Sequence, residues 1–220
     1  MPNLPLLLGH RGARASARVS ENTLPGFDLC LEHGCDGFEF DLRLTGCGRA
    51  LVCHDPRVRG IAVSRATCDQ LTDLPRLEDV LQRYREHSFL DIELKVRNLE
   101  SKTLTALRES PPQCGCVVSS FVPDVVLELR GRSATVPVGI ICEKPAQLVK
   151  WGQLPVDYVI AQESLVDQRL VEEVQNAGRK ILVWTVNEKS RMLQLADWGV
   201  DGIISDETEL LVRTLRQAGA

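Results

Sequence analysis

The stretch GFEFDLRLT at residues 37–45 carries the clearest signal of the fold, because acidic and hydrophobic residues alternate in it. In a β-strand this period of two places Glu39 and Asp41 on one face and the phenylalanines on the other. A second run, FLDIELK, places Glu93 and Lys95 on one face of another strand in the same way. An ordinary half-exposed strand, with its acids in water, would explain one such run. Two runs, with histidines at the ends of other apolar stretches, indicate strands whose acids point into a shared site.

Strands and helices alternate along the chain, with few residues left over. Gly34, Gly178 and Gly199 lie just past three expected helix ends, where a left-handed residue often closes a helix. Asn187 and Asp206 stand where two other helices are expected to begin, and we expect them to cap those helices. Eight strand–helix units without a linker favour one closed (β/α)8 TIM barrel, with an open doubly wound sheet as the alternative. The expected strands are 4–10, 37–45, 89–95, 115–121, 137–143, 157–161, 180–186 and 202–205, and the expected helices are 22–33, 77–87, 99–109, 123–131, 146–152, 167–177, 188–198 and 207–218.

Length and composition exclude several classes of protein. A chain of 220 residues with 25% charged and 44% hydrophobic residues fits one soluble globular domain, which we expect to span residues 1–220. The net charge of -4 argues against a nucleic-acid binder, which needs a basic field. No apolar run approaches the roughly 20 residues of a membrane span, and the apolar start at 4–8 has neither the basic region nor the cleavage site of a signal peptide. We therefore expect a cytoplasmic protein without stable membrane association, and leave open whether it forms a homo-oligomer.

The eight cysteines form no CxxC pair, and the spacing of Cys114 and Cys116 does not suit a structural zinc site. A chain of this length does not need disulfides to fold. Most of its cysteines stand among apolar residues, where cysteine acts as a small hydrophobe. We therefore expect reduced thiols. Cys53 precedes His54, but the alternation of a strand is expected to turn it away from the site.

Polar residues stand at the ends of several expected strands, which is where barrel enzymes place their catalytic groups. His10 ends the first strand, while Glu39, Asp41 and Glu93 belong to the second and third. His54 follows a short extra strand, which we interpret as a hairpin that continues the second strand above the barrel rim and folds back toward His10. Three carboxylates supply hard oxygen ligands for a divalent cation, and two imidazoles can transfer protons. These five residues make up a complete reaction centre.

An ordered series of short motifs runs through the chain, and it begins with the same residues. The motifs are His10-Arg11-Gly12, Glu21-Asn22-Thr23, the pair Glu39 and Asp41, His54-Asp55, Glu93-Leu94-Lys95, Trp184-Thr185-Val186-Asn187 and GVDGIISD at 199–206. This series resembles that of the glycerophosphodiester phosphodiesterase family, and the resemblance covers nearly the whole chain. Each motif is weak alone, whereas the ordered series is highly specific. The resemblance implies a phosphoric diester hydrolase.

The resemblance also implies the metal and the proton-transfer groups. Glu39, Asp41 and Glu93 would hold one Mg²⁺ or Ca²⁺, and carboxylate-only coordination suits those ions better than zinc or copper. His10 and His54 would flank the phosphorus as general base and general acid, because displacement requires proton transfer at both the entering and the leaving oxygen. Which histidine is the acid and which is the base stays open.

Four further residues are implied in binding the substrate or its phosphate. Arg11 and Lys95 would neutralise charge on the phosphate oxygens. Asn22 would tie the substrate or the first histidine in place, and Trp184 would form a wall of the pocket. Beyond the resemblance, Glu143 reaches the rim at the fifth strand and is a candidate substrate contact.

Three functions remain open. The first is hydrolysis of a small glycerophosphodiester to glycerol phosphate and an alcohol, the second a phospholipase D-like activity on lysophospholipids, and the third a non-catalytic barrel. The rim loops at 13–20 and 56–66 are mostly small, polar or basic, which favours a soluble small-molecule phosphodiester. A non-catalytic barrel would be expected to have lost one of the five central residues, and all five are present. Only 38 residues lie between His54 and Glu93, so we expect a polar connection instead of a large cap, and an open pocket with modest selectivity.

Overall fold

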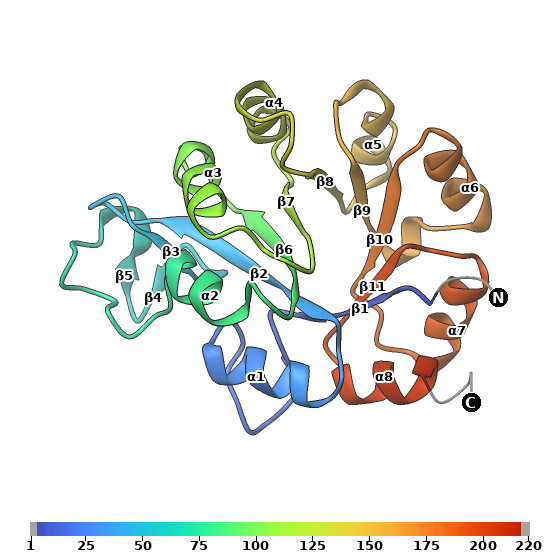
Figure 1. The fold of residues 1–220 in the computed structure, drawn as a ribbon, viewed down its shortest axis with the longest axis horizontal. Coiled ribbons are helices and arrows are strands. Elements are labelled where there is room, and N and C mark those ends of the chain that lie inside the picture. The colour runs from blue at the N-terminus through green and yellow to red at the C-terminus, as the bar shows by residue number, and fades with distance from the viewer. Residues whose placement is uncertain (1–3, 217–220) are drawn as a thin grey trace.

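The computed structural model describes residues 4–216, and its largest sheet is a closed barrel (Figure 1). The barrel strands are β1 (Leu6–His10), β2 (Gly37–Leu44), β6 (Phe89–Leu94), β7 (Cys116–Ser120), β8 (Val138–Cys142), β9 (Tyr158–Gln162), β10 (Lys180–Trp184) and β11 (Gly202–Ser205). Each strand pairs in parallel with its neighbours, and β1 pairs with both β2 and β11. The first and last strands therefore close the ring, which confirms the (β/α)8 barrel and excludes the open sheet.

Helices surround the barrel and follow its strands in turn, as the alternating pattern predicts (Figure 1). They are α1 (Leu24–Glu32), α2 (Leu77–Tyr84), α3 (Glu100–Glu109), α4 (Pro123–Arg132), α5 (Pro145–Leu148), α6 (Gln168–Asn176), α7 (Lys189–Asp197) and α8 (Thr208–Arg216). The helix expected at 146–152 is split into the short α5 and a 3₁₀ turn. None of the helices within residues 4–216 is long and apolar enough to cross a membrane.

The three glycines predicted to follow helix ends are confirmed, whereas the two residues predicted to cap helix starts are wrong. Gly34, Gly178 and Gly199 all have positive φ, as left-handed helix caps require. Asn187 and Asp206 do not cap helices, because α7 begins after Glu188 and α8 begins at Thr208. The side chains of Asn187 and Asp206 instead form a hydrogen bond with each other.

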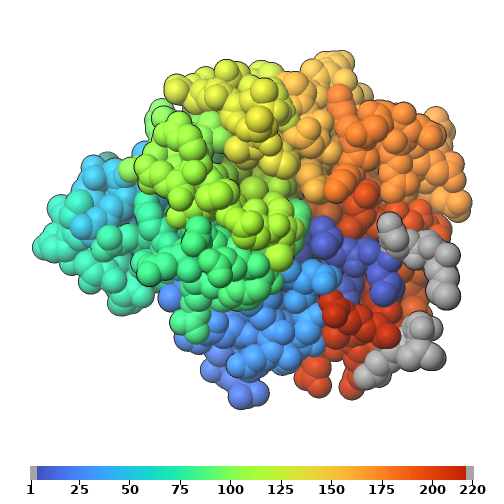
Figure 2. Space-filling view, in the orientation of Figure 1, coloured from blue at the N-terminus to red at the C-terminus, as the bar shows by residue number. Residues whose placement is uncertain are grey.

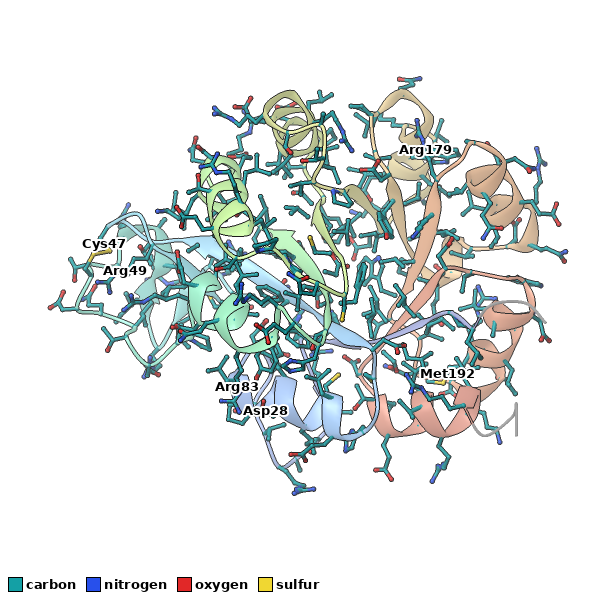
Figure 3. The ribbon with its side chains drawn as sticks, viewed as in Figure 1. Asp28, Cys47, Arg49, Arg83, Arg179 and Met192 are labelled. Carbon is teal, nitrogen blue, oxygen red and sulfur yellow. A yellow bond between two sulfur atoms is a disulfide. The ribbon has the colours of Figure 1, made fainter. Side chains whose placement is uncertain are left out.

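The phenylalanines of β2 point away from the barrel interior and pack beneath α1 and α2. The ring of Phe38 stacks on Phe27 of α1 with 4.1 Å between centroids, and Tyr84 of α2 meets Phe38 edge-on at 5.0 Å. Arg83 of α2 reaches Asp28 of α1 across the outside of this layer (Figure 3). This buried aromatic layer fixes which face of β2 is turned outward, so its two acids must face the interior.

Residues 45–76 form a small lobe beside the barrel, which we call the hairpin lobe (Figures 1 and 2). Its strand β3 (Ala50–Val52) pairs antiparallel with β2, which confirms the predicted hairpin. The connection that follows is predicted to be merely polar, and this prediction is incomplete. It contains the two-stranded ribbon of β4 (Arg57–Val58) and β5 (Ile61–Ala62). The lobe also has its own apolar cluster, which contains Leu51, Cys53, Val63, Ala66 and Leu71.

A disulfide joins Cys47 to Cys68 inside the hairpin lobe (Figure 3). The expectation of reduced thiols is therefore wrong for this pair, while the other six cysteines are free. The turn after β2 and the returning loop bring the two Cα atoms to 5.6 Å, although 21 positions separate them in the sequence. His54 lies within the loop that this bond closes.

We expect the disulfide to stabilise the hairpin lobe. Replacing Cys47 and Cys68 by serine should lower the free energy of unfolding by about 2–4 kcal/mol, because the open loop gains conformational freedom in the unfolded state. Thermal unfolding of the variant, and of the parent with and without dithiothreitol, measures this effect. Cys114→Ser, at an exposed free cysteine, is the matched control. An unchanged melting temperature in the double variant and in the reduced parent would contradict the expectation.

Candidate active site

A cavity of about 350 Å³ opens at the carboxyl ends of the barrel strands. Seven of the nine predicted site residues line it, namely His10, Arg11, Glu39, His54, Glu93, Lys95 and Trp184. Asp41 and Asn22 are the other two; both are buried and lie behind the lining residues. The predicted residues thus come together in one place, with Asp41 and Asn22 in its wall.

Glu39, Asp41 and Glu93 form a buried carboxylate triad, in which one oxygen of each lies within 4.8 Å of the others. The period of two in β2 brings the first pair to one face, and β6 places Glu93 directly beside Asp41 in the register. Asp91 lies one step deeper on the same face of β6. It accepts a hydrogen bond of 2.7 Å from Ser119, as expected of a group in the barrel interior.

Burial and mutual repulsion oppose full ionisation of the triad. Burial raises the pKa of Glu39 well above its usual range, and the charges of Asp41 and Glu93 raise it further. Burial also raises the pKa of Glu93 to about 7, although Lys95 opposes the shift. Burial acts on Asp41 in the same direction, but Lys95, Arg11 and Asn22 together hold the pKa of that carboxyl below its usual value. A bound cation would relieve this repulsion.

The residues present fit a divalent cation. Asp41 Oδ1 is buried and accepts no hydrogen bond within the described residues, although the Lys95 ammonium lies 3.3 Å away. The three side chains offer only oxygen, which is the ligand that Mg²⁺ and Ca²⁺ prefer. The triad could therefore hold either ion.

Arg11 and Lys95, the two basic residues predicted to bind phosphate, both form ion pairs with acidic residues of the site. Lys95 Nζ lies 2.8 Å from Glu93 Oε1. The Arg11 side chain reaches Glu21 at 2.9 Å and Asp41 at 3.2 Å, while its backbone N–H donates to Glu39 at 3.0 Å. Arg11 has a φ of 53°, in the left-handed region.

Asn22 fixes the position of one triad member. Its amide donates to Asp41 Oδ2 at 2.7 Å, and its carbonyl oxygen accepts from the Asp41 backbone N–H at 3.2 Å. Through these two bonds the Asn22 side chain bridges the carboxylate and the backbone N–H of Asp41 and so fixes the orientation of the carboxylate. The geometry favours a role in holding Asp41 in place, and a direct substrate contact for Asn22 stays a prediction.

His10 is held by an aspartate from the opposite end of the chain. Its Nδ1 lies 2.8 Å from Asp206 Oδ1, and its Nε2 lies 3.9 Å from Glu39 Oε2. Asp206 also accepts hydrogen bonds from Asn187 and Arg14. Burial would raise the pKa of Asp206, but hydrogen bonds from His10 and Asn187 outweigh it and lower that pKa. An ionised Asp206 keeps the proton on Nδ1 and leaves Nε2 directed at the cavity.

Sequence reasoning missed Asp206 because the residue resembled a helix cap. The available signal was its place directly after the last strand, at the same rim as the other polar residues. Its partner lies 196 positions away, so no local pattern could reveal the contact.

His54 is held in a similar way from the hairpin lobe. Its Nδ1 lies 2.8 Å from Asp55 Oδ1, and its backbone carbonyl accepts from Arg43 at 2.6 Å. The side chain is about a third exposed, whereas that of His10 is nearly buried. Cys53 is buried and does not line the cavity, as expected. Each imidazole thus has its Nδ1 on an aspartate, and in the described part of the chain neither Nε2 makes a hydrogen bond.

Asp206 is expected to act as a positioning residue for His10. Asp206→Asn should lower kcat by about 10²-fold or more with little change in KM, because an amide no longer favours the productive tautomer. Steady-state kinetics measures kcat and KM separately, and ¹⁵N NMR of the imidazole reports the tautomer. Asp197→Asn, on the exposed side of α7, is the control. If kcat and the tautomer are both unchanged in Asp206→Asn, the positioning role is wrong.

Comparison with known proteins identifies what this arrangement resembles. The model of the glycerophosphoryl diester phosphodiesterase family matches residues 10–114 and 102–210. A glycerophosphodiester phosphodiesterase of Caldanaerobacter subterraneus subsp. tengcongensis is 27% identical over 248 residues, which cover 97% of this chain and 99% of the relative.

Solved structures share the fold at lower sequence identity. A glycerophosphodiester phosphodiesterase from Parabacteroides distasonis has a TM-score of 0.87 at 21% identity and covers all of both chains. A phosphodiesterase from Oleispira antarctica, solved in complex with the product sn-glycerol-3-phosphate, has a TM-score of 0.84 at 22% identity and covers 97% of each chain.

Proposed function

Because the chain belongs to the glycerophosphoryl diester phosphodiesterase family, we propose that it hydrolyses glycerophosphodiesters to glycerol phosphate and an alcohol, with two histidines and one divalent cation. The chain is a phosphoric diester hydrolase by its family and relatives. The observation that carries the mechanism is the single cavity that contains two aspartate-bound imidazoles and borders a buried carboxylate triad. The sn-glycerol-3-phosphate in the Oleispira antarctica enzyme supports a glycerol phosphate unit as one product.

In this proposal Glu39, Asp41 and Glu93 hold the cation. When bound, Mg²⁺ or Ca²⁺ would neutralise charge on the phosphate oxygens and make the phosphorus easier to attack. Lys95 lies beside the triad and adds positive charge at the same place. Asn22 and the Arg11 backbone keep two of the carboxylates in position.

His10 and His54 carry out the two proton transfers. One Nε2 removes the proton from the attacking hydroxyl, and the other gives a proton to the departing alcohol oxygen. Their aspartate partners stabilise each imidazole while it is charged. The attacking hydroxyl is water in simple hydrolysis, and a hydroxyl of the substrate itself in a route through a cyclic phosphate.

Product analysis tests this function. The full chain is incubated with a panel of glycerophosphodiesters and lysophospholipids, with and without EDTA, and the products are identified by ³¹P NMR. We expect cation-dependent release of glycerol phosphate from the small diesters. Cyclic phosphate as the final product would support the internal route instead, and turnover of lysophospholipids alone would support the phospholipase D-like activity. Full turnover after EDTA treatment would exclude the role of the cation.

The cellular compartment and the oligomeric state stay predictions. The sequence predicts a cytoplasmic location, whereas the Cys47–Cys68 disulfide favours an oxidising environment. Fractionation of cells, with thiol trapping of the isolated protein, measures the location and the state of this bond together.

A further inference from the structure

The cavity is divided into two chemically different halves. Charged side chains come from β1, β2, β6 and the hairpin lobe, where the triad and both histidines lie. The opposite wall comes from the strands β7 to β11 and is apolar. Its apolar residues are Phe121, Ile141, Ile160, Trp184 and Ile204. A phosphate bound at the charged half would therefore place one of its two substituents against an apolar surface.

This apolar wall offers few hydrogen bonds to a ligand. The Trp184 Nε1–H is already used, since it donates to the Ile160 carbonyl oxygen at 3.3 Å. Phe121 meets Trp184 edge-on with 5.6 Å between ring centroids, so the two rings form an aromatic corner. A polyol that entered this half would lose hydrogen bonds to water without replacement.

One charged residue interrupts the wall. Glu143 follows β8 and is the only charged residue that β7 to β11 and their loops contribute to the lining, as far as the structure describes it. It is exposed, and no lysine or arginine within residues 4–216 forms an ion pair with it. The nearby Lys95, 5.5 Å from the Phe121 ring centre, is itself paired with Glu93 and Asp41.

We propose that Glu143, Phe121 and Trp184 form a subsite for a quaternary ammonium group on the leaving alcohol, an inference that rests on the proposed function. A trimethylammonium group has apolar methyls that suit the wall and a positive charge that suits both aromatic rings and a free carboxylate. It has no N–H donors to satisfy. A primary ammonium needs hydrogen-bond acceptors, and this wall supplies only the one carboxylate. The subsite therefore favours choline over ethanolamine, and both over a neutral alcohol.

Substrate competition tests the subsite in the full chain with added divalent cation. We expect kcat/KM for glycerophosphocholine to exceed that for glycerophosphoglycerol about tenfold, which corresponds to about 1.4 kcal/mol. Glu143→Gln should reduce this ratio about fivefold, and Glu143→Lys should abolish the preference. Glu163→Gln is the matched control, because Glu163 follows the next strand, β9, but does not line the cavity. Its ratio should equal that of the parent.

A second measurement separates the effect of the ligand's positive charge on binding from the effect of its shape. Choline and its neutral carbon isostere, 3,3-dimethyl-1-butanol, are compared as inhibitors, and choline should bind about fivefold more tightly to the parent and equally to Glu143→Gln. Equal binding to the parent, or equal loss of both diester activities in Glu143→Gln, would overturn the subsite. If no diester is hydrolysed at all, the proposed function fails, whereas the choline comparison by calorimetry still decides the subsite.

Discussion

Glu39→Gln is expected to abolish cation binding and to lower turnover by about 10³-fold or more, since a bound ion would supply several kcal/mol of charge stabilisation. The same substitution should raise the melting temperature of the cation-free protein by roughly 2–4 °C. Burial and two neighbouring carboxylates raise the pKa of Glu39, so the neutral amide relieves a repulsion that the native chain retains. Glutamine can still accept the hydrogen bond from the Arg11 N–H.

Calorimetric titration with Mg²⁺ and Ca²⁺, thermal unfolding in EDTA and steady-state kinetics together measure these effects. Glu32→Gln, at the exposed end of α1, is the control and should change none of them. The metal hypothesis is lost if Glu39→Gln keeps the cation affinity of the parent and turns over within tenfold of it. A lower melting temperature without cation would show that Glu39 stabilises the fold instead.

His10→Ala and His54→Ala should each lower turnover by about 10²–10⁴-fold, the usual contribution of a general acid or base. The double variant should lose far less than the product of the two, because both proton transfers serve one displacement and the loss of either already blocks it. Neither variant should unfold the chain, since both side chains lie at the cavity and outside the apolar clusters.

A diester with a good leaving group shows which histidine is the general acid and which is the general base. A nitrophenyl phosphodiester needs no proton on the departing oxygen, so it should restore the rate of the variant that lacks the acid and help the other little. His33→Ala, at the end of α1, is the control. Near-normal rates of both variants on the natural diester would mean that the paired imidazoles do not carry out the reaction.

Much of this arrangement could be predicted because it is local. The period of two in β2 fixes where Glu39 and Asp41 point, and the alternation of strands and helices fixes the barrel that gathers strand ends at one rim. The turn before β3 was readable as a hairpin, which placed His54 above that rim. These features depend on neighbours in the sequence.

The features that could not be predicted depend on distant partners. Asp206 is an ordinary cap candidate until the closure of β1 on β11 brings it to His10. Asn22 is predicted as a site residue, but its contact with Asp41 depends on the left-handed turn of its backbone and could not be predicted. Cys47 and Cys68 have no motif in common, and only the folded hairpin lobe brings them together.

The pairing of β1 with β11, which closes the barrel, also sets when an enzyme molecule can begin to work. All five central residues lie within positions 10–93 and are therefore made well before Asp206. During synthesis the growing polypeptide therefore contains both imidazoles and the whole triad, yet His10 has no partner to orient it and β1 has an open edge. The reaction centre is therefore complete only when β11 and Asp206 have been made and lie against β1 and His10. We therefore expect nascent chains, and chains that end before β11, to be inactive, because they lack the strand that closes the ring and the aspartate that holds His10.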